Sequence, residues 1–353
     1  MSNDRVRTVL VPASKPYQVD IGRNILPRCG AEIRSRLPAR IAAVVADETV
    51  AQLYGETVCR SLQEAGLEAP LFQFAPGEQS KTLTTVSALL SFLVEKGLTR
   101  ADCVVALGGG IAGDVAGFAA AVYLRGIPVI QLPTTFLAAI DSSVGGKTGV
   151  NLPAGKNLAG AFWQPSYVLC DCACFETLPH EVFLDGVAEA VKYGVIADEP
   201  LFESLRSGAL NGDIEAVAAR CVEIKSRFVA EDEFDKGARQ LLNFGHTLGH
   251  AVEKCSGYAV THGHAVAVGM VAAARAAQRL GVADGEPLRR IEEILAAFGL
   301  PRRTELPLHA LAAVMRSDKK TAGGRITLVL PKKIGECVLY PVSVDALESA
   351  FAG

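Results

Sequence analysis

The chain has 353 residues, half of them hydrophobic, and a formal net charge of −3. This length predicts two domains with substantial cores, and the near-neutral charge argues against a nucleic-acid-binding protein, which usually presents a basic face. The N-terminus lacks the apolar core of a signal peptide, and no run of about 18 apolar residues occurs, so we expect a cytoplasmic protein without a membrane span. The nine cysteines are scattered, which is typical of reduced thiols.

Strand-like and helix-like segments alternate through the first half of the chain. Short β-rich runs occupy residues 41–47, 71–76, 103–108 and 128–133, and helical periodicity occurs in each of the stretches between them. Alternation of this kind predicts a mostly parallel sheet covered by helices. We therefore expect residues 1–179 to form an α/β domain with a Rossmann-like sheet.

A glycine-rich turn joins the run at 103–108 to the next helical segment. Gly108, Gly110 and Gly113 stand in G-x-G-x-x-G register, and glycine in such a turn lets the backbone approach a pyrophosphate at a helix N-terminus. The motif is weak alone, and a plain strand–helix turn is the alternative. Asp114 directly follows the last glycine, and no acid comes about 20 residues later to bind a ribose. An unusual NAD site therefore fits better than a standard one.

The sequence DSSVGGKTG offers a second phosphate-binding candidate. Gly146, Lys147 and Thr148 resemble the end of a P-loop, but that loop needs another glycine five residues before Gly146, where this chain has Asp141. The spacing excludes this kind of nucleotide triphosphatase. Lys147 remains a candidate anion ligand in a glycine-rich turn.

Three cysteines lie close together in the sequence CDCAC. Their period-two spacing would put Cys170, Cys172 and Cys174 on one face of a strand. A metal site is one interpretation. Packing as small apolar residues is favoured, because no second pair of cysteines or histidines lies at ligand spacing nearby.

The pattern changes to helical from about residue 180 to residue 299. Five segments with 3.6-residue periodicity begin near residues 183, 214, 238, 264 and 287. A late strand is expected at residues 325–331. We therefore expect residues 180–353 to form a second, all-α domain.

Four of the six histidines lie within 19 positions of this second half, and Arg239 and Asn243 stand just before them. His246 and His250 are four residues apart and share one helix face, whereas His262 and His264 stand just before an apolar helix. A site of two histidines and a carboxylate could use Glu189, which lies on an apolar helix where an unpaired carboxylate would be costly to bury. Spacing alone favours His246 and His250 as the pair of metal ligands.

Basic residues recur where the predicted helices meet loops. Two of them, Lys192 and Lys225, lie within apolar helical faces, which is uncommon for lysine. Solvated surface charge is the alternative, but together the cations suggest a phosphorylated or carboxylated substrate. The set comprises Lys156, Lys192, Lys225, Arg239, Lys319 and Lys320.

Several long motifs, in one order, resemble those of the 3-dehydroquinate synthase family of sugar-phosphate cyclases. They run from PGEQSK through GGGIAGD, DSSVGGKTGVNLPAGKN, GVAEAVKYG and RQLLNFGHTLGH to DKK. The resemblance implies an NAD-binding α/β domain, a helical domain, and a shikimate-pathway enzyme that converts 3-deoxy-D-arabino-heptulosonate 7-phosphate to 3-dehydroquinate and phosphate. It also implies transient oxidation by NAD, phosphate elimination, re-reduction and an intramolecular aldol closure, so that NAD is not consumed.

The resemblance assigns roles to particular residues. The ligands of zinc or cobalt would be Glu189, His246 and His262. This set differs from the pair His246 and His250 that spacing favours, because His250 falls on a substrate-contact position of the family. Catalytic roles would fall to Asp141, Lys192, Lys225, Arg239, Asn243 and His250. Substrate-binding positions are Arg125, Lys147, Asn157, Lys319 and Lys320. The NAD contacts would be Glu78, Lys81, Gly109, Gly110, Gly113, Asp114, Thr134, Thr135, Lys147, Lys156 and Thr177. In the family the arginine at position 125 reaches a partner subunit, so a homodimer is implied.

Two residues depart from the family pattern. His264 stands where the family often has Glu, and we expect it to solvate the start of its helix rather than to support the metal. Asp235 replaces a usual Glu and is one methylene shorter, so a contact there must shift or pass through water.

Three other functions compete with the 3-dehydroquinate synthase interpretation. Another cyclase, making an aminodehydroquinate or a cyclitol, is one, although Arg239 with Lys225 favours a substrate that carries a carboxylate. A metal-dependent polyol dehydrogenase is the second, and it would consume NAD. A non-catalytic NAD-binding regulator would not need Lys147 and Arg239 in addition to the three candidate metal ligands.

Overall fold

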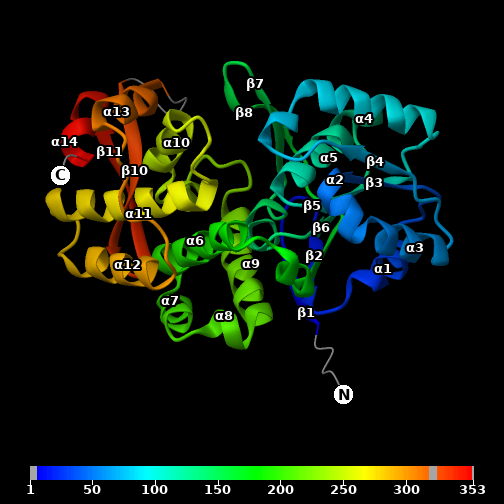
Figure 1. Cartoon of the computed structure of the whole chain (residues 1–353), viewed down its shortest axis with the longest axis horizontal. Helices are drawn as coiled ribbons and strands as arrows, with labels where there is room; N and C mark the ends of the chain where they lie inside the picture. The colour runs from blue at the N-terminus through cyan, green and yellow to red at the C-terminus, as the bar shows by residue number, and fades with distance from the viewer. Residues whose placement is uncertain (1–5, 318–323, 352–353) are drawn as a thin grey trace. The chain divides into compact units, whose positions relative to one another are not determined.

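The computed structural model describes residues 6–317 and 324–351, and the chain divides into two compact units (Figure 1). Unit 1 comprises Met1–Leu178 and Ala218–Phe234, and unit 2 comprises Pro179–Val217 and Asp235–Gly353. Compactness alone groups Ala218–Phe234 with unit 1, so the domain boundary predicted after residue 179 stays a prediction. Among the described residues, no helix combines the length and the apolar character needed to cross a membrane.

Unit 1 is built on a seven-stranded sheet with the order β1-β2-β9-β6-β5-β3-β4. All neighbouring strands are parallel except β1 and β2. The central strands are continuous buried runs rich in Val, Ala and Leu, which is typical of a parallel sheet covered on both faces. The strands are β1 Arg7–Val11, β2 Tyr17–Gly22, β3 Ala42–Asp47, β4 Leu71–Phe74, β5 Cys103–Gly108, β6 Val129–Pro133 and β9 Tyr167–Asp171.

Helices pack against this sheet and build its core. Val45 of β3 and Ala106 of β5 belong to one buried cluster with Leu89 of α4 and Val115 of α5. A separate antiparallel hairpin is formed by β7 (Lys147–Leu152) and β8 (Gly155–Phe162). The helices are α1 Cys29–Arg36, α2 Glu48–Val50, α3 Glu56–Glu64, α4 Leu83–Glu95, α5 Gly110–Val122 and, from Ala218 on, α9 Ile214–Glu231.

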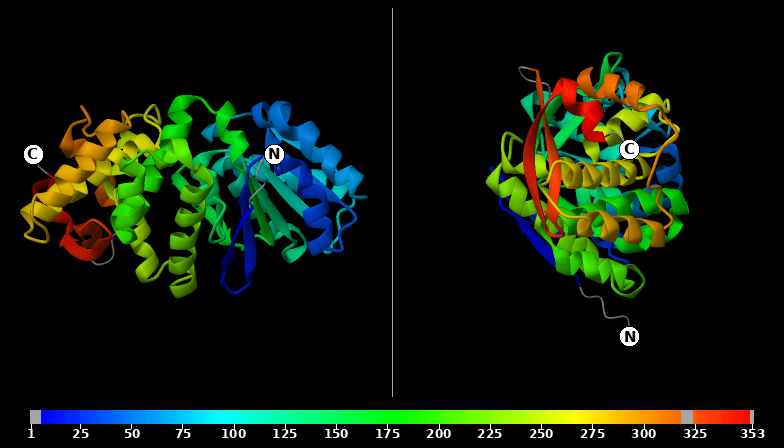
Figure 2. Two further views of the ribbon diagram at one scale, coloured as in Figure 1. Left: turned by 90° about the horizontal axis from the view of Figure 1, so that it is seen from below. Right: turned by 90° about the vertical axis from the view of Figure 1, so that its left-hand side faces the viewer.

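Unit 2 is rich in helices that surround the long helix α11. This helix contacts α6, α10 and α12, and its small residues allow close approach: a Cβ on Gly269 would lie 1.8 Å from the carbonyl oxygen of Gly245. The right-hand view of Figure 2 shows the β10–β11 hairpin lying across α11 and α12. The elements are α6 His180–Ala197, α7 Glu199–Arg206, α8 Ala209–Gly212, α10 His246–Cys255, α11 His262–Arg279, α12 Glu286–Ala297, α13 Leu308–Ser317, β10 Arg325–Lys333, β11 Glu336–Ser343 and α14 Leu347–Phe351.

The predicted fold class is confirmed: a mainly parallel sheet comes first and a helix-rich part follows. The predicted β-rich runs at 41–47, 71–76, 103–108 and 128–133 form β3, β4, β5 and β6, and the late strand forms β10. The partner strand β11 was not predicted. It gives the helical part a small antiparallel sheet.

Two local predictions were wrong. The single helix expected from residue 238 is a 3-10 helix, Ala238–Asn243, followed by α10, because Gly245 takes a left-handed φ of 78° and breaks the run. The three cysteines of CDCAC do not share a strand. Strand β9 ends at Asp171, whose side chain accepts the N–H of Ala173, so only Cys170 is in the strand. All three cysteines are buried, as packing requires.

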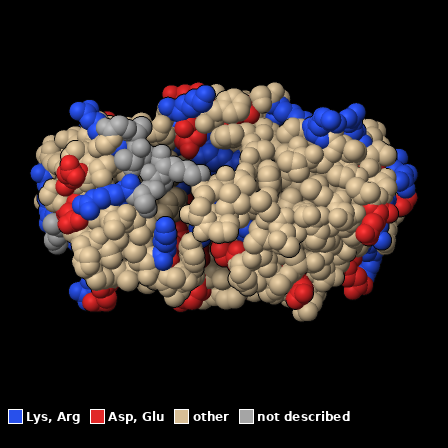
Figure 3. Space-filling model, turned by 90° about the horizontal axis from the view of Figure 1, so that it is seen from above, with Lys and Arg blue, Asp and Glu red and all other residues tan. Residues whose placement is uncertain are grey.

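One face of the molecule shows charged side chains of both signs. On the face drawn in Figure 3, Lys and Arg lie interspersed with Asp and Glu, and the described cations do not gather into one continuous area. This distribution agrees with the near-neutral composition.

Asp102 is a buried carboxylate that connects the starts of two central strands, β3 and β5. Its Oδ1 accepts the N–H groups of Arg40 and Ile41, at 2.9 and 2.7 Å, and its Oδ2 accepts the N–H and the hydroxyl of Thr99. We expect Asp102→Ala to lower the free energy of unfolding by about 2–4 kcal/mol, because buried donors lose a charged acceptor. Urea unfolding followed by circular dichroism measures this loss. Asp102→Asn keeps one acceptor and should lose less, and an unchanged midpoint in Asp102→Ala would contradict this account.

Candidate functional site

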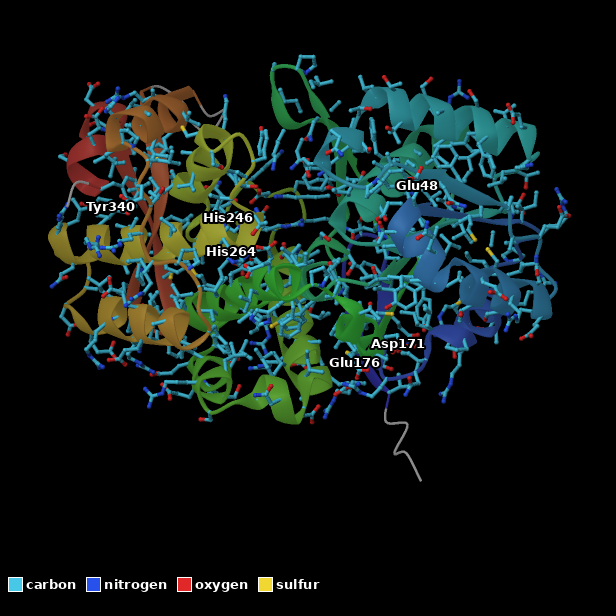
Figure 4. All side chains as sticks on the ribbon, viewed as in Figure 1. Glu48, Asp171, Glu176, His246, His264 and Tyr340 are labelled. Atoms are coloured by element: carbon cyan, nitrogen blue, oxygen red, sulfur yellow. The ribbon has the colours of Figure 1, made fainter. Side chains whose placement is uncertain are left out.

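Three side chains of unit 2 converge on one point. Glu189 is fully buried in the middle of α6, His246 is the first residue of α10, and His262 is the first residue of α11. The Nε2 atoms of His262 and His246 lie 3.2 and 3.5 Å from Oε1 of Glu189. One donor atom from each of the three lies within 4.8 Å of the other two, so this set can hold a metal ion. In Figure 4, His246 comes from α10 and His264 from the neighbouring α11.

The other nitrogen of each imidazole faces an acceptor. Nδ1 of His246 is 3.0 Å from the carbonyl oxygen of Phe244, and Nδ1 of His262 is 3.4 Å from Oε2 of Glu253. Because a carbonyl oxygen can only accept, Nδ1 of His246 carries the hydrogen and Nε2 has a lone pair to offer. Histidines that ligate metals are commonly held in this way.

The separations match a tetrahedral metal site. Ligand atoms about 2.0–2.1 Å from a tetrahedral zinc lie roughly 3.3–3.4 Å from one another. The observed separations of 3.2 and 3.5 Å between Glu189 Oε1 and the two imidazole nitrogens are close to this value. The donor set of two imidazoles and one carboxylate therefore fits a divalent metal.

The protonation of the two histidines differs. Burial would lower the pKa of His262, but hydrogen bonds and charge from Glu189 and Glu253 outweigh it and raise the pKa to about 10. Burial holds the pKa of His246 well below its usual value, despite the charge of Glu189. Without a metal, Glu189 therefore faces one imidazolium and one neutral imidazole.

Lys192 and Arg239 place cations inside unit 2. Lys192 is 1% exposed and its ammonium pairs with Oε2 of Glu189, so the two oxygens of Glu189 have different partners. Arg239 is also 1% exposed, and the amide of Asn243 donates to the carbonyl of Gln240 at 3.0 Å. Burial of Lys192 agrees with the apolar helical pattern from which it was singled out.

His250 lies on α10 one turn after His246, with the ring centroids 5.4 Å apart. It is exposed, and it belongs to a second group of possible donors with Glu253 and His262. The pairing of His246 with His250 that spacing alone favours is therefore not the one that includes the buried Glu189.

The expectation that His264 is solvated at the start of its helix was wrong, whereas its role toward the metal stays a prediction. Its side chain is only 15% exposed, with Nε2 2.8 Å from a carboxylate oxygen of Glu181 and Nδ1 3.0 Å from Oδ1 of Asp185. The hydrogen bond with Asp185 is the main reason that the pKa of His264 is raised. Asp185 and Glu253 were both missed by the sequence reasoning. The available signal for Asp185 was its position four residues before Glu189, on the same helix face.

The glycine turn of unit 1 lies at the carboxyl end of the sheet. Gly108 ends β5 and Gly110 begins α5. Strands β5 and β3 are neighbours in the sheet, but the chain continues from β5 to β6 on one side and from β3 to β4 on the other. Ligands bind open α/β sheets at such a reversal. A Cβ added to Gly108 would lie 2.8 Å from Cβ of Ala112, and a Cβ added to Gly110 would lie 3.1 Å from Oγ of Ser142. Glycine at both positions avoids these close contacts, and a glycine turn before a helix N-terminus is the arrangement that accepts a dinucleotide phosphate.

The other residues with predicted NAD contacts form a polar cluster in the same unit. The Lys81 ammonium pairs with Asp114 and donates to Oδ1 of Asn157 at 2.6 Å. Glu78 accepts the amide of Asn151 at 2.7 Å, and Lys156 lies 3.9 Å from the same carboxylate. Asn157, Asn151 and Lys156 all belong to the β7–β8 hairpin, which the sequence did not predict.

The remaining predicted residues of unit 1 are placed as follows. The Lys225 ammonium donates to the carbonyl and to Oδ1 of Asp141 at 2.6 and 2.8 Å. Lys147 is exposed at the start of β7, and Arg125 is exposed in a turn with a φ of 67°. Thr134 donates its N–H to the carbonyl of Gly108, and the hydroxyl of Thr135 accepts the N–H of Ala138. The hydroxyl of Thr177 lies 2.5 Å from that of Tyr54. A Cβ added at Gly109 would meet the side chain of Thr135, and one added at Gly113 would meet that of Gln131. Lys319 and Lys320 lie outside the described residues.

Comparison with known proteins points to one family. The family described as 3-dehydroquinate synthase N-terminal matches residues 71–185, and 3-dehydroquinate synthase C-terminal matches residues 186–321. The 3-dehydroquinate synthase of Streptococcus pneumoniae (strain JJA) is 41% identical over 342 residues, covering 94% of this chain and 96% of the relative. That of Streptococcus suis (strain 05ZYH33) is 42% identical over 350 residues, covering 96% and 98%.

Solved structures of related cyclases share the fold. A 2-deoxy-scyllo-inosose synthase complexed with carbaglucose-6-phosphate, NAD+ and Co2+ is 25% identical with a TM-score of 0.85, covering 98% of this chain and 100% of its own. The 2-epi-5-epi-valiolone synthase ValA from Streptomyces hygroscopicus, with NAD+ and Zn2+ bound, is 27% identical with a TM-score of 0.86, covering 95% of each chain. An iron-containing alcohol dehydrogenase, 16% identical with a TM-score of 0.67 over 98% of both chains, shares the fold alone.

The raised pKa of His262 predicts a pH dependence of stability in the chelator-treated protein. A group whose folded pKa lies above its ordinary value stabilises fully below that value, here 6.5, and the contribution is lost as the pH rises through about 10. We expect the urea midpoint of the parent protein to fall more between pH 6.5 and 10 than that of His262→Gln. Groups such as Lys and Cys titrate in both proteins and cancel in the comparison. Equal pH dependence would contradict the charged state of His262.

Proposed function

The chain belongs to the 3-dehydroquinate synthase family, and we propose that it converts 3-deoxy-D-arabino-heptulosonate 7-phosphate to 3-dehydroquinate and phosphate. This is a phosphate-eliminating carbon–oxygen lyase reaction of the shikimate pathway, which leads to the aromatic amino acids. The observation that carries the proposal is the convergence of Glu189, His246 and His262 within the helix-rich unit. The glycine turn of unit 1 supports it independently.

The metal ligands in this proposal are Glu189, His246 and His262. Three protein ligands are the number that catalytic zinc sites use, and this donor set accepts zinc or cobalt. The bound metal supplies Lewis-acid polarisation of a substrate hydroxyl. The ion pair between Lys192 and Oε2 of Glu189 supports the assignment, because it fixes the carboxylate with Oε1 toward the imidazoles.

The NAD-binding residues in this proposal are the glycine turn with Asp114, Glu78 and Lys81. NAD supplies a reversible hydride acceptor when bound. The backbone at Gly109 and Gly110 would approach the pyrophosphate at the start of α5. The remaining contacts would come from Gly113, Thr134, Thr135, Lys147, Lys156 and Thr177, all of which belong to unit 1.

Cations of this chain would recognise and orient the substrate anions. The guanidinium of the buried Arg239 suits bidentate binding of a carboxylate. Lys225 donates to both the carbonyl and the carboxylate of Asp141, which fixes the orientation of that carboxylate for contact with a substrate hydroxyl. Phosphate contacts are assigned to Arg125, Lys147, Asn157, His250, Lys319 and Lys320. Holding one substrate in place through several steps supplies much of the rate.

A homodimer belongs to the proposal as well. Arg125 is exposed, and both it and Leu124 adopt left-handed φ angles, 67° and 49°, which are uncommon for residues other than glycine. An arginine held outward by a strained turn suits a contact with a partner subunit.

The decisive experiment assays the purified protein with the heptulosonate phosphate and a catalytic amount of NAD. We expect release of inorganic phosphate and formation of 3-dehydroquinate without net accumulation of NADH, because the hydride taken from the substrate returns to it. Phosphate is measured colorimetrically and NADH by its absorbance in the same reaction.

Two outcomes of this assay would overturn the proposal. Stoichiometric NADH would make the protein a dehydrogenase. No phosphate release from the heptulosonate phosphate, together with turnover of sedoheptulose 7-phosphate, would make it a cyclitol-forming cyclase.

The metal assignment has its own test. We expect His246→Ala and His262→Ala to lose bound metal in elemental analysis, because each removes one of three ligands. His250→Ala is the matched control, since it removes an imidazole one turn along the same helix. It should keep the metal and lose turnover. Loss of metal from His250→Ala to the same extent as from His246→Ala would show that the ligands are assigned wrongly.

A further inference from the structure

The first turn of α11, which begins with His262, lacks a carboxylate of its own to cap it. The residue before the helix is Thr261, and the third residue of the helix is His264. This spacing matches the capping box, in which the third position is normally Glu or Gln. Among the described residues, the Thr261 hydroxyl does not accept a backbone N–H of its own helix, although it lies 2.8 Å from Nδ1 of His264. The orphan N–H groups of α11 therefore need another acceptor.

Asp185 of the neighbouring helix α6 supplies that acceptor. Its Oδ1 lies 2.8 Å from the N–H nitrogen of Gly263 and 3.2 Å from that of His264. These are the second and third N–H groups of α11, the ones that an N-cap side chain satisfies. The Thr261 hydroxyl is directed to the same oxygen, at 2.6 Å, which explains why it does not cap its own helix.

The side chain of His264 strengthens the junction. Its ring lies between Oδ1 of Asp185, 3.0 Å from Nδ1, and Oε2 of Glu181, 2.8 Å from Nε2. Both acids belong to the first two turns of α6. The backbones approach closely here, since a Cβ on Gly263 would lie 2.3 Å from the Cα of Asp185. Only glycine at position 263 permits this contact.

This junction adjoins the candidate metal ligands on both helices. Asp185 and Glu189 are four residues apart and share one face of α6. On α11, His262 directly precedes Gly263, and Gly263 donates its N–H to Asp185. We propose that Asp185 is a positioning residue for the metal site: by capping α11 from α6, it sets the distance between the His262 imidazole and the Glu189 carboxylate. The inference rests on the proposed metal ligands.

The test is the affinity of the full-length protein for Co2+, measured by competition with a chromophoric chelator, together with the visible spectrum of the bound Co2+. We expect Asp185→Ala to weaken Co2+ binding at least about tenfold, as loss of a group that orients a metal ligand typically does, and to alter the spectrum. Asp185→Asn keeps an oxygen that can cap the helix, and asparagine caps about as well as aspartate. It should stay within about threefold of the parent affinity.

Asp198→Ala is the matched control. Like Asp185, Asp198 is a carboxylate that caps a helix: it is buried, accepts the N–H of Leu201 at 2.7 Å, and lies at the far end of α6 from Asp185. Its loss should lower the thermal midpoint of the chelator-treated protein, as loss of Asp185 does, and should leave Co2+ affinity unchanged. A comparable loss of affinity in Asp198→Ala would overturn the proposal, because any weakened cap would then suffice.

A double-mutant cycle gives the sharpest comparison. His264→Glu alone places a third carboxylate beside Asp185 and Glu181, and should weaken Co2+ binding. Combined with Asp185→Ala, the same change restores a capping box within α11 and should recover affinity relative to Asp185→Ala. The effect of His264→Glu therefore changes sign with the residue at position 185. An effect of the same sign in both backgrounds would overturn the proposal.

Failure of this inference is distinguishable from failure of the proposed function. If the parent protein binds Co2+, His246→Ala loses it and Asp185→Ala keeps it at parent affinity, Asp185 is only a helix cap and the positioning role is wrong. If the parent protein does not bind Co2+, or His246→Ala binds it equally well, the metal assignment itself is wrong.

Discussion

The buried carboxylate of Glu189 is the constraint on which the arrangement of unit 2 depends. It is fully buried within an apolar helix, where an uncompensated charge would cost several kcal/mol. Its two oxygens meet Lys192 on one side and the imidazoles of His246 and His262 on the other. Because the two histidines belong to α10 and α11, a shift of either helix against α6 would remove one partner of this carboxylate. The contacts that make burial of the carboxylate tolerable therefore also hold the candidate metal ligands together.

The candidate site of unit 1 depends on the absence of side chains at its glycines, whereas that of unit 2 depends on contacts between side chains. At Gly108 and Gly110 the room that a Cβ would fill is already bordered by Ala112 and Ser142. The turn is also held in place, because Thr134 donates its N–H to the carbonyl of Gly108. A larger side chain here would displace both the turn and any phosphate bound to it. A site defined by backbone geometry tolerates change at the surrounding polar positions better than at the glycines.

The sequence alone predicted the fold class, the parallel strands and the position of the histidine cluster, because each depends on local periodicity or composition. It did not predict which histidines converge. Spacing along one helix favours His246 with His250, whereas the contact with Glu189 joins residues far apart in the chain. The cap at Asp185 was missed for the same reason, since it acts on residues 76 to 79 positions later. The break at Gly245 was missed because helical periodicity continues across it, and only the close approach of Gly269 explains why it is there.

The position of both histidines at helix starts has an electrostatic consequence. Each helix N-terminus carries a partial positive charge, which disfavours a metal cation beside it. Side chains also tilt toward the N-terminus of their own helix, so a first-turn imidazole presents its ligand to this unfavourable end. The surrounding acids offset the effect. Glu253 faces the ring nitrogen of His262 that is turned away from Glu189, and Asp185 accepts the N–H groups of Gly263 and His264 in the first turn of α11. Since Lys192 already offsets much of the negative charge of Glu189, the carboxylates of Glu253 and Asp185 supply the negative charge that favours a cation at the start of α11.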